Sequence, residues 1–332
     1  MERYIDSGEP VASGTLKRQD LPMSSASIRA IMAQLEKGCY LFQPHTSAGR
    51  IPTALGYRAY VDRLMDPPKL PEASKDIVSY AVDEGAAPVE QLRACAGALA
   101  QATGLTGFSL FAPTNNARHR QLELVRLSAD RVLGIFVALS GTIRHRIVEL
   151  DDAPTSIALT QIQNYLNARF EGQSYKVIET LIGETLEQTT TDSHTTLSHR
   201  AFSLAAELFS SPEKSSVNVT LEGQSHLLSY PEFSTARTVE PVLQEMERDS
   251  TWDALLHRVL GDVDVTVLIG PENSVQGFKQ CAIAATSVPC DSGVCSVGIV
   301  GPTRLAYRSV IATVAFFGRY LAQRWNVQRN TA

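Results

Sequence analysis

The sequence predicts an α+β chain of several domains, and three observations support this prediction. Residues 11–64 form a pattern of short helices around a hairpin, residues 120–150 contain three β-rich runs, and residues 155–260 are mostly helical in pattern. The last part of the chain holds three further β-rich runs and a long amphipathic helix, over 263–269, 280–286, 294–300 and 303–323. A helical region between two β-rich regions indicates a sheet interrupted by an inserted unit.

Composition places the chain among ordinary soluble proteins. Its 332 residues are 44% hydrophobic and 20% charged, which suits two or three globular domains. No apolar run is long enough to span a bilayer, and the first residues lack a signal-peptide pattern. The five cysteines include no CxxC pair, which favours free thiols in a reducing cytoplasm.

The first predicted helix-turn-helix begins with a short helix over 11–16 and a turn at 20–23, where Pro22 prevents helix continuation. Ser24 is a good N-cap for the second helix, and Gly38 is expected to end it in a left-handed conformation. An apolar stripe at i, i+3, i+4 and i+7 is expected to face the core: Ile28, Ile31, Met32 and Leu35.

A hairpin and another helix follow. Residues 40–43 predict a short strand, and the turn over 47–50 carries a cation, Arg50, at its tip. Thr53 is expected to cap the next helix, which carries an apolar face with Tyr57 and Tyr60. Helix, turn, helix and β-wing is a DNA-binding layout, although similar units occur in proteins that do not bind DNA.

Several longer stretches resemble the heat-inducible transcription repressor HrcA family. They are GEPVASGTL (8–16), LPMSSASIR (21–29), LEKGCYLFQPHTSAGRIPTALGYRAYVD (35–62), IGPEN (269–273) and GPTRLAYRSVI (301–311). The resemblance covers nearly the whole chain and is weakest between about residues 185 and 235.

The resemblance implies a fold of three parts. These are an N-terminal winged helix-turn-helix domain over 1–66 with a shortened first helix, a discontinuous GAF-like α/β domain with an antiparallel sheet over 72–154 and 261–332, and a mostly helical inserted dimerisation domain over 155–260. The proline-rich stretch 66–71 is the expected linker.

The implied function is negative regulation of class I heat-shock chaperone operons in the bacterial cytoplasm. A homodimer is expected to bind an inverted-repeat operator in double-stranded DNA, so that the bound protein is nucleoid-associated, with the GroE chaperonin keeping the repressor competent. The alternative is a ligand-responsive winged-helix regulator that senses a small molecule through the GAF-like domain.

The candidate DNA-binding residues lie on the second helix, in the wing and after it. They are Ser25, Ala26, Arg29, Ala30, Ala33, His45, Thr46, Ser47, Arg50 and Arg58. Arg29 is suited either to a guanine edge or to a phosphate. His45 is suited equally to a structural hydrogen bond, and Arg58 to a phosphate contact or a surface charge.

Two departures from the family pattern affect these expectations. The family commonly has Asn-Asp where this chain has Ala30-Ile31, so an adenine contact at that position is lost. Only about one turn of the first helix precedes Gly8, which suggests that Met1 is a misassigned or truncated start.

The net charge of −5 is compatible with DNA binding because it is unevenly distributed. Residues 1–66 hold eight basic and seven acidic side chains, so the acidic excess lies in the rest of the chain. Phosphate contacts are local, so this balance permits DNA binding without proving it.

Other kinds of site find little support in the sequence. Gly301–Arg304 fits a capping turn with an interface arginine better than an anion site. Neither Cys290-x4-Cys295 nor His194-x4-His199 has the spacing or surroundings of a zinc site. The common hydrolase, metalloprotease and nucleotide-binding motifs are absent, so we expect no catalytic residue, no cofactor, no metal and no membrane contact.

Overall fold

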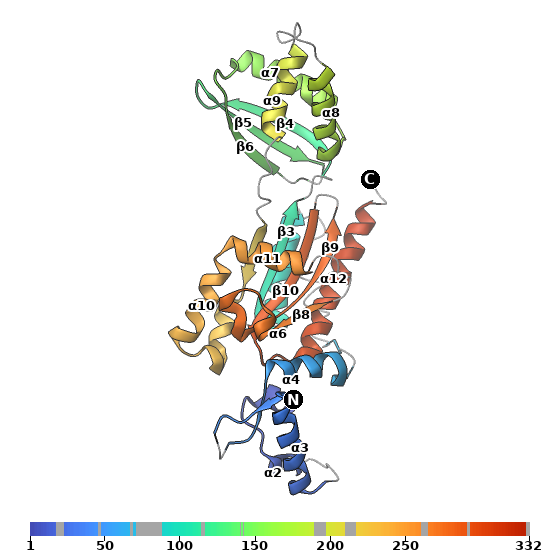
Figure 1. The fold of residues 1–332 in the computed structure, drawn as a ribbon. Helices are drawn as coiled ribbons and strands as arrows, with labels where there is room; N and C mark the ends of the chain where they lie inside the picture. Colours follow the sequence, from blue (N-terminus) through green and yellow to red (C-terminus); the bar gives the residue numbers. More distant parts are fainter. Residues whose placement is uncertain are drawn as a thin grey trace. The chain divides into compact units, whose positions relative to one another are not determined.

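The structure is a computed structural model that describes residues 1–17, 23–45, 48–66, 69–70, 88–113, 117–139, 141, 143–188, 197–209, 217–259, 265–290 and 293–329. The chain divides into two compact units. The first comprises Met1–Leu110, Val219–Val288 and Ser296–Ala332, and the second comprises Phe111–Asn218 and Pro289–Cys295. Helices and antiparallel strand pairs occur in both parts of this α+β fold (Figure 1).

The N-terminal part of the first unit consists of short elements. These are α1 (Glu2–Ser7), α2 (Ser13–Lys17), α3 (Ser25–Lys37), β1 (Leu41–Phe42), β2 (Ile51–Pro52), α4 (Ala54–Ala59) and the π-helical turn η1 (Tyr60–Leu64). Both predicted caps are confirmed, because Ser24 Oγ accepts from Ser27 N–H at 3.0 Å and Thr53 Oγ1 accepts from Gly56 N–H at 3.1 Å.

Helix α3 ends at Lys37, directly before Gly38, as the sequence predicts. The left-handed residue is Cys39, with φ 61°, whereas Gly38 has φ −80°, so the prediction of a left-handed Gly38 is wrong. Cys39 N–H donates to Glu36 O and Tyr40 N–H donates to Leu35 O, both at 2.9 Å. These two bonds are the pattern of a Schellman motif, and they set Cys39 at its left-handed position.

The C-terminal part of the first unit is built on a five-stranded sheet of order β7-β3-β10-β9-β8. Its strands are β3 (Thr106–Pro113), β7 (Asn218–Glu222), β8 (Thr266–Ile269), β9 (Cys281–Cys290) and β10 (Gly293–Pro302). Its helices are α6 (Pro88–Thr103), α10 (Ala236–Met246), α11 (Asp249–Val259) and α12 (Tyr307–Arg329). Trp252 of α11 packs on Phe108 of β3 with ring centroids 5.1 Å apart, which joins helix and sheet in one core.

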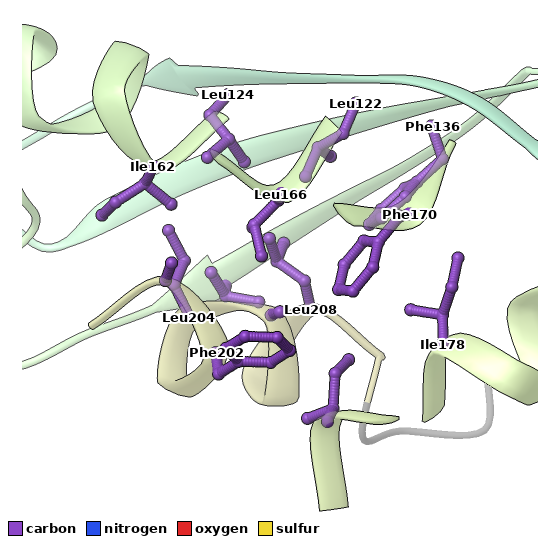
Figure 2. Packing of buried hydrophobic residues seen from close by; sticks show 14 of the residues in the cluster. Leu122, Leu124, Phe136, Ile162, Leu166, Phe170, Ile178, Phe202, Leu204 and Leu208 are labelled. Carbon is purple, nitrogen blue, oxygen red and sulfur yellow. The ribbon is translucent and has the colours of Figure 1, made fainter. Parts of the chain in front are cut away.

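The second unit packs three helices on a three-stranded sheet. The strands are β4 (His119–Arg126), β5 (Arg131–Ala138) and β6 (Ile143–Glu149), and the helices are α7 (Ser156–Phe170), α8 (Tyr175–Gln188) and α9 (Leu197–Phe209). Leu122, Leu166 and Phe170 are fully buried in its core (Figure 2). These three helices confirm the helical pattern predicted for the first half of residues 155–260.

Side-chain amides of α7 cover the free edge of β4. Asn167 accepts from Leu122 N–H at 2.6 Å and donates to Leu122 O at 2.8 Å, and Gln163 accepts from Leu124 N–H at 2.9 Å. The amides thus replace a neighbouring strand and satisfy backbone groups that would otherwise remain unpaired.

The expected domain boundaries need correction. The strands of 120–150 do not share a sheet with the C-terminal strands, because β4, β5 and β6 pair only with one another among the described residues. The inserted unit therefore begins near Phe111 rather than at 155, and α10 and α11 belong to the first unit. The interruption of one sheet by an insert is confirmed. The strand of that sheet that precedes the insert in the sequence is β3, not one of the strands of 120–150.

Two strands, β3 and β7, were not predicted. The described residues of β3 from Thr106 to Phe111 are all buried, so this strand lacks the alternation of apolar and polar residues that marks a strand with one exposed face. The C-terminal helix also begins later than expected, at Tyr307 rather than at residue 303.

The second unit has a buried histidine in its core. His119 is fully buried, with Nε2 3.1 Å from Asn167 Oδ1. Burial lowers the pKa of His119 below its ordinary value of 6.5, although the hydrogen bond to Asn167 acts in the opposite direction.

We predict that the second unit loses stability as the pH falls from about 7.5 to 5.5. Below about pH 6.5 the unfolded chain binds a proton that the folded chain does not, with a limiting slope of about 1.4 kcal/mol per pH unit. Hydrogen exchange of peptides from β4 and β5 should show this slope, and His119→Gln should reduce it. His257→Gln, which changes an exposed histidine, is the control. An unchanged slope in His119→Gln would contradict the role of His119 in this loss of stability.

Candidate nucleic-acid interface

Helix α3 presents an exposed face of small side chains around one arginine. Ala26, Arg29 and Ala30 are exposed, and Ser25 and Ala33 are half-buried. Small side chains let a helix approach another surface closely, and Arg29 supplies a planar, charged group with several donors. The geometry thus suits contact with a polar, anionic groove.

The apolar side of α3 is only partly covered. Ile28 and Met32 are buried, but Ile31 and Leu35 are 42% and 40% exposed, so half of the predicted core stripe is wrong. Ile31 and Leu35 instead line a groove of about 480 Å³ together with residues of α1, β1 and η1.

The hairpin after α3 is tied to the N-terminal segment. Strands β1 and β2 are antiparallel, and Val11 adds a bridge to Arg50 through two backbone hydrogen bonds of 2.9 and 3.0 Å. A Cβ on Gly49 would lie 2.4 Å from Val11 C, so glycine is required for this close approach. His45 is exposed in the loop, and Thr46 and Ser47 lie outside the described residues.

The sequence analysis expected Arg50 at the tip of the loop, and this expectation is wrong. Arg50 stands at the base of the hairpin, where Nη2 is 2.9 Å from Glu36 Oε2 of α3, and its side chain is only 14% exposed. The ion pair braces the hairpin against the end of α3. Arg50 therefore contributes to the rigidity of the candidate interface, whether or not it also contacts a ligand.

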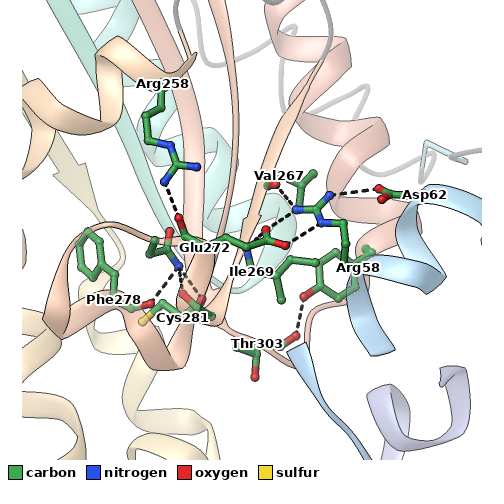
Figure 3. A network of polar contacts seen from close by, with 12 residues as sticks. Arg58, Asp62, Arg258, Val267, Ile269, Glu272, Phe278, Cys281 and Thr303 are labelled. Carbon is green, nitrogen blue, oxygen red and sulfur yellow. Dashed lines mark hydrogen bonds and ion pairs between the residues drawn. The ribbon is translucent and has the colours of Figure 1, made fainter. Parts of the chain in front are cut away.

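Arg58, the last candidate, is engaged by groups of the C-terminal part of the first unit. Its Nε donates to Glu272 Oε1 at 2.8 Å, and Nη2 donates to Glu272 Oε2 and to Val267 O. Nη1 donates to Asp62 at 3.1 Å (Figure 3). This is a bidentate arginine–carboxylate pair, which is the geometry that guanidinium groups favour.

The carboxylate that receives Arg58 is itself held in place. Ile269 N–H donates to Glu272 Oε2 at 2.8 Å, and Arg258 donates to the Glu272 carbonyl. Burial by itself would raise the pKa of Glu272, but the hydrogen bonds from Arg58 and Ile269 and the charges of Arg58 and Arg258 hold it below its ordinary value. Glu272 is therefore charged at neutral pH.

The turn that carries Glu272 is stabilised by the next residue. Asn273 is buried, and its Nδ2 lies 2.9–3.0 Å from three carbonyl oxygens, those of Gly270, Phe278 and Cys281. Gly270 has φ +54°, a left-handed conformation that favours glycine. These contacts fix the shape of the turn between β8 and β9.

An aromatic pair lies beside this ion pair. Tyr57 of α4 and Tyr307 of α12 are buried, with ring centroids 5.7 Å apart, and Tyr307 Oη donates to Thr303 O at 2.6 Å. Burial raises the pKa of both tyrosines, so both are neutral. The pair supplies apolar contact between α4 and the C-terminal part.

Arg304 makes a second polar link between the same two parts. Its Nε donates to Glu232 Oε1 and its Nη1 donates to Ile5 O, both at 2.8 Å, and its side chain is 12% exposed. A Cβ on Gly8 would lie 3.1 Å from Arg304 Cζ. The expectation of an interface arginine is thus confirmed.

Sequence reasoning did not identify Glu272 or Glu232. Arg58 and Glu272 are 214 residues apart, so no local spacing relates them. Glu272 lies in the stretch IGPEN, which contributed to the family resemblance, but the sequence analysis assigned no role to this glutamate.

Other kinds of site find little support among the described residues. No group of three His, Cys, Asp or Glu side chains there is arranged to hold a metal ion, and no helix there is long and apolar enough to cross a bilayer. The cavity beside Tyr230 and Arg304 has a volume of only about 90 Å³, below the roughly 300 Å³ at which small-molecule pockets begin.

Comparison with known proteins identifies the family. Residues 90–311 match the family model described as "HrcA protein C terminal domain". The heat-inducible transcription repressor HrcA of Carboxydothermus hydrogenoformans is 32% identical, with 97% of this chain and 94% of the relative covered. The HrcA proteins of Geobacter sulfurreducens and Chromobacterium violaceum are 30% and 32% identical with the same coverage.

A solved structure supports the fold. A crystal structure described only as that of a hypothetical protein matches with a TM-score of 0.60 at 21% identity, covering 98% of this chain and 95% of that chain. Together with the family model and the relatives, these matches lead to one conclusion: the chain belongs to the HrcA family of heat-inducible transcription repressors.

Proposed function

We propose that this repressor binds an inverted-repeat operator of class I heat-shock genes as a homodimer in the bacterial cytoplasm. In this proposal α2, α3 and the β1–β2 hairpin form a winged helix, and α3 is the recognition helix. The observation that carries the proposal is the exposed face of α3, where Arg29 stands among small residues beside a braced hairpin.

The roles of the candidate residues follow from their surroundings. Ser25, Ala26, Ala30 and Ala33 allow α3 to enter the major groove, while Arg29 reads a base edge or holds a phosphate. His45, Thr46 and Ser47 of the wing are proposed backbone or minor-groove contacts. Arg50 is proposed to support the wing through Glu36.

We predict that Arg29 sets base preference. On an inverted-repeat heat-shock operator, Arg29→Ala should cost about 1–3 kcal/mol of binding free energy and relax preference at one base pair, because a guanine edge loses two hydrogen bonds. A salt titration against a scrambled duplex makes the measurement, and a preference of roughly a thousandfold is expected for the unaltered chain.

Arg29→Lys is the matched variant for this test. It keeps the charge but loses the planar fork, so a base contact predicts a loss of specificity in both variants. A phosphate contact would give a different result. The slope of log binding constant against log salt concentration would decrease by about one for Arg29→Ala, and Arg29→Lys would keep normal specificity.

We further propose that the second copy docks on the outer face of the sheet in the second unit. The strand register aligns Val125, Leu133 and Ile147 in one row and Val137 with Ile143 in another, on the side opposite the buried core. Ile143 is 66% exposed and Ile147 is 44% exposed. The row of Glu123, Ile135 and His145 lies between these two apolar rows, and exposed apolar side chains on a sheet face beside the edge strand β6 favour self-association.

Charged substitutions on that face should dissociate the dimer. We predict that Ile143→Glu and Ile147→Glu shift the protein from dimer to monomer in sedimentation equilibrium, because each places a charge in a dry interface. Ile157→Glu on α7, which alters a still more exposed isoleucine, is the control. Dissociation by the control alone would refute the proposed face.

The GroE chaperonin is proposed as the partner that maintains the DNA-binding form, as the family resemblance implies. The five-stranded sheet supports this proposal, because β3 lies beside β10 across an insert of more than one hundred residues, and such non-local pairing slows folding. We predict that chaperonin with ATP raises the operator-binding fraction of refolded protein above that with chaperonin alone. An unchanged fraction would contradict the coupling.

A further inference from the structure

Three segments far apart in the sequence meet at one junction within the first unit. Residues 54–62 supply Arg58 and Tyr57, residues 267–273 supply Glu272, and residues 301–308 supply Arg304 and Tyr307. Each of these contacts joins the N-terminal part to the C-terminal part. Together they hold the N-terminal part in one placement on the C-terminal part of the first unit.

The hydrogen bonds of the Arg58 guanidinium argue against a role for Arg58 in binding a DNA phosphate. Nε and Nη2 are both engaged by Glu272, Nη2 also donates to Val267 O, and Nη1 donates to Asp62. A phosphate would have to displace a bidentate carboxylate to reach this guanidinium. The side chain of Arg58 is 28% exposed, so it is accessible to solvent only in part.

The glutamate that receives Arg58 also has partners other than Arg58. Glu272 is held by Ile269 N–H and by Arg258, and Asn273 fixes the turn through three carbonyl oxygens. A carboxylate held in this way favours one orientation of the Arg58 guanidinium, because a bidentate pair requires both groups to lie in one plane. Helix α4, which directly follows β2, is thereby fixed in orientation.

We propose that Arg58 and Glu272 are positioning residues, which hold the DNA-binding part of each protomer so that the two halves of a dimer engage an operator together. This inference rests on the proposed function. Linking two binding modules increases affinity only when the geometry lets both engage at once. The ion pair therefore acts on binding to the complete inverted repeat without touching DNA.

The test compares Arg58→Ala, Glu272→Gln and the double variant on two duplexes, a complete inverted repeat and a single half-site. Each variant should bind the complete operator roughly three- to tenfold more weakly, a small part of the affinity that linkage supplies. The double variant should be no weaker than the weaker single variant, because both remove one interaction. Half-site affinity and the salt slope should not change.

Other roles of Arg58 give different results. A phosphate contact predicts that Arg58→Ala alone weakens both duplexes and lowers the salt slope by about one, with Glu272→Gln harmless. A role in folding alone predicts equal losses on half-site and operator. Either result would overturn the inference. Arg93→Ala, which breaks the exposed pair with Glu222 within the C-terminal part, is the control and should bind normally.

A measurement without DNA separates this inference from the proposed function. Hydrogen exchange should increase in peptides from α4 and from residues 266–273 in both single variants, since each loses the same contact. Equal binding of the unaltered chain to operator and scrambled duplexes would refute the proposed function and the effect on affinity. Unchanged exchange in both variants would refute the ion pair itself.

Discussion

The bidentate pair of Arg58 and Glu272 is the interaction on which the arrangement of the first unit depends. It joins the helix after the hairpin to a turn between β8 and β9, and Asn273 gives that turn its shape through three carbonyl contacts. Partly exposed ion pairs stabilise a fold by only about 1 kcal/mol. The pair therefore selects an orientation, while the buried Tyr57 and Tyr307 provide the apolar contact.

In the second unit, too, apolar contacts provide stability and polar contacts set the arrangement. Its aromatic and aliphatic core supplies the stabilisation, and the polar contacts of Asn167 and Gln163 decide how β4 is used. These amides occupy the edge of the sheet at β4, and the proposed dimer face lies beside the other edge strand, β6. Partly buried polar side chains in both units thus specify the arrangement of the elements more than they add stability.

The candidate DNA-binding residues fall into three structural groups. Ala26, Arg29 and Ala30 are exposed on α3, Arg50 braces the hairpin through Glu36, and Arg58 faces the C-terminal part. The sequence analysis left a guanine edge or a phosphate open for Arg29 and a phosphate or a surface charge open for Arg58, because the sequence does not show which groups an arginine contacts. Their partners distinguish them, because a guanidinium that already holds a carboxylate has fewer donors left for a phosphate.

The sequence by itself determined the α+β class and the caps at Ser24 and Thr53, because capping and periodicity are local, and its longer stretches carried the resemblance to the HrcA family. Only the tertiary structure decided that β4–β6 form their own sheet and that Arg58 meets Glu272. Backbone donors and acceptors are chemically alike on every strand, so a strand's pattern shows which face is buried but not what buries it.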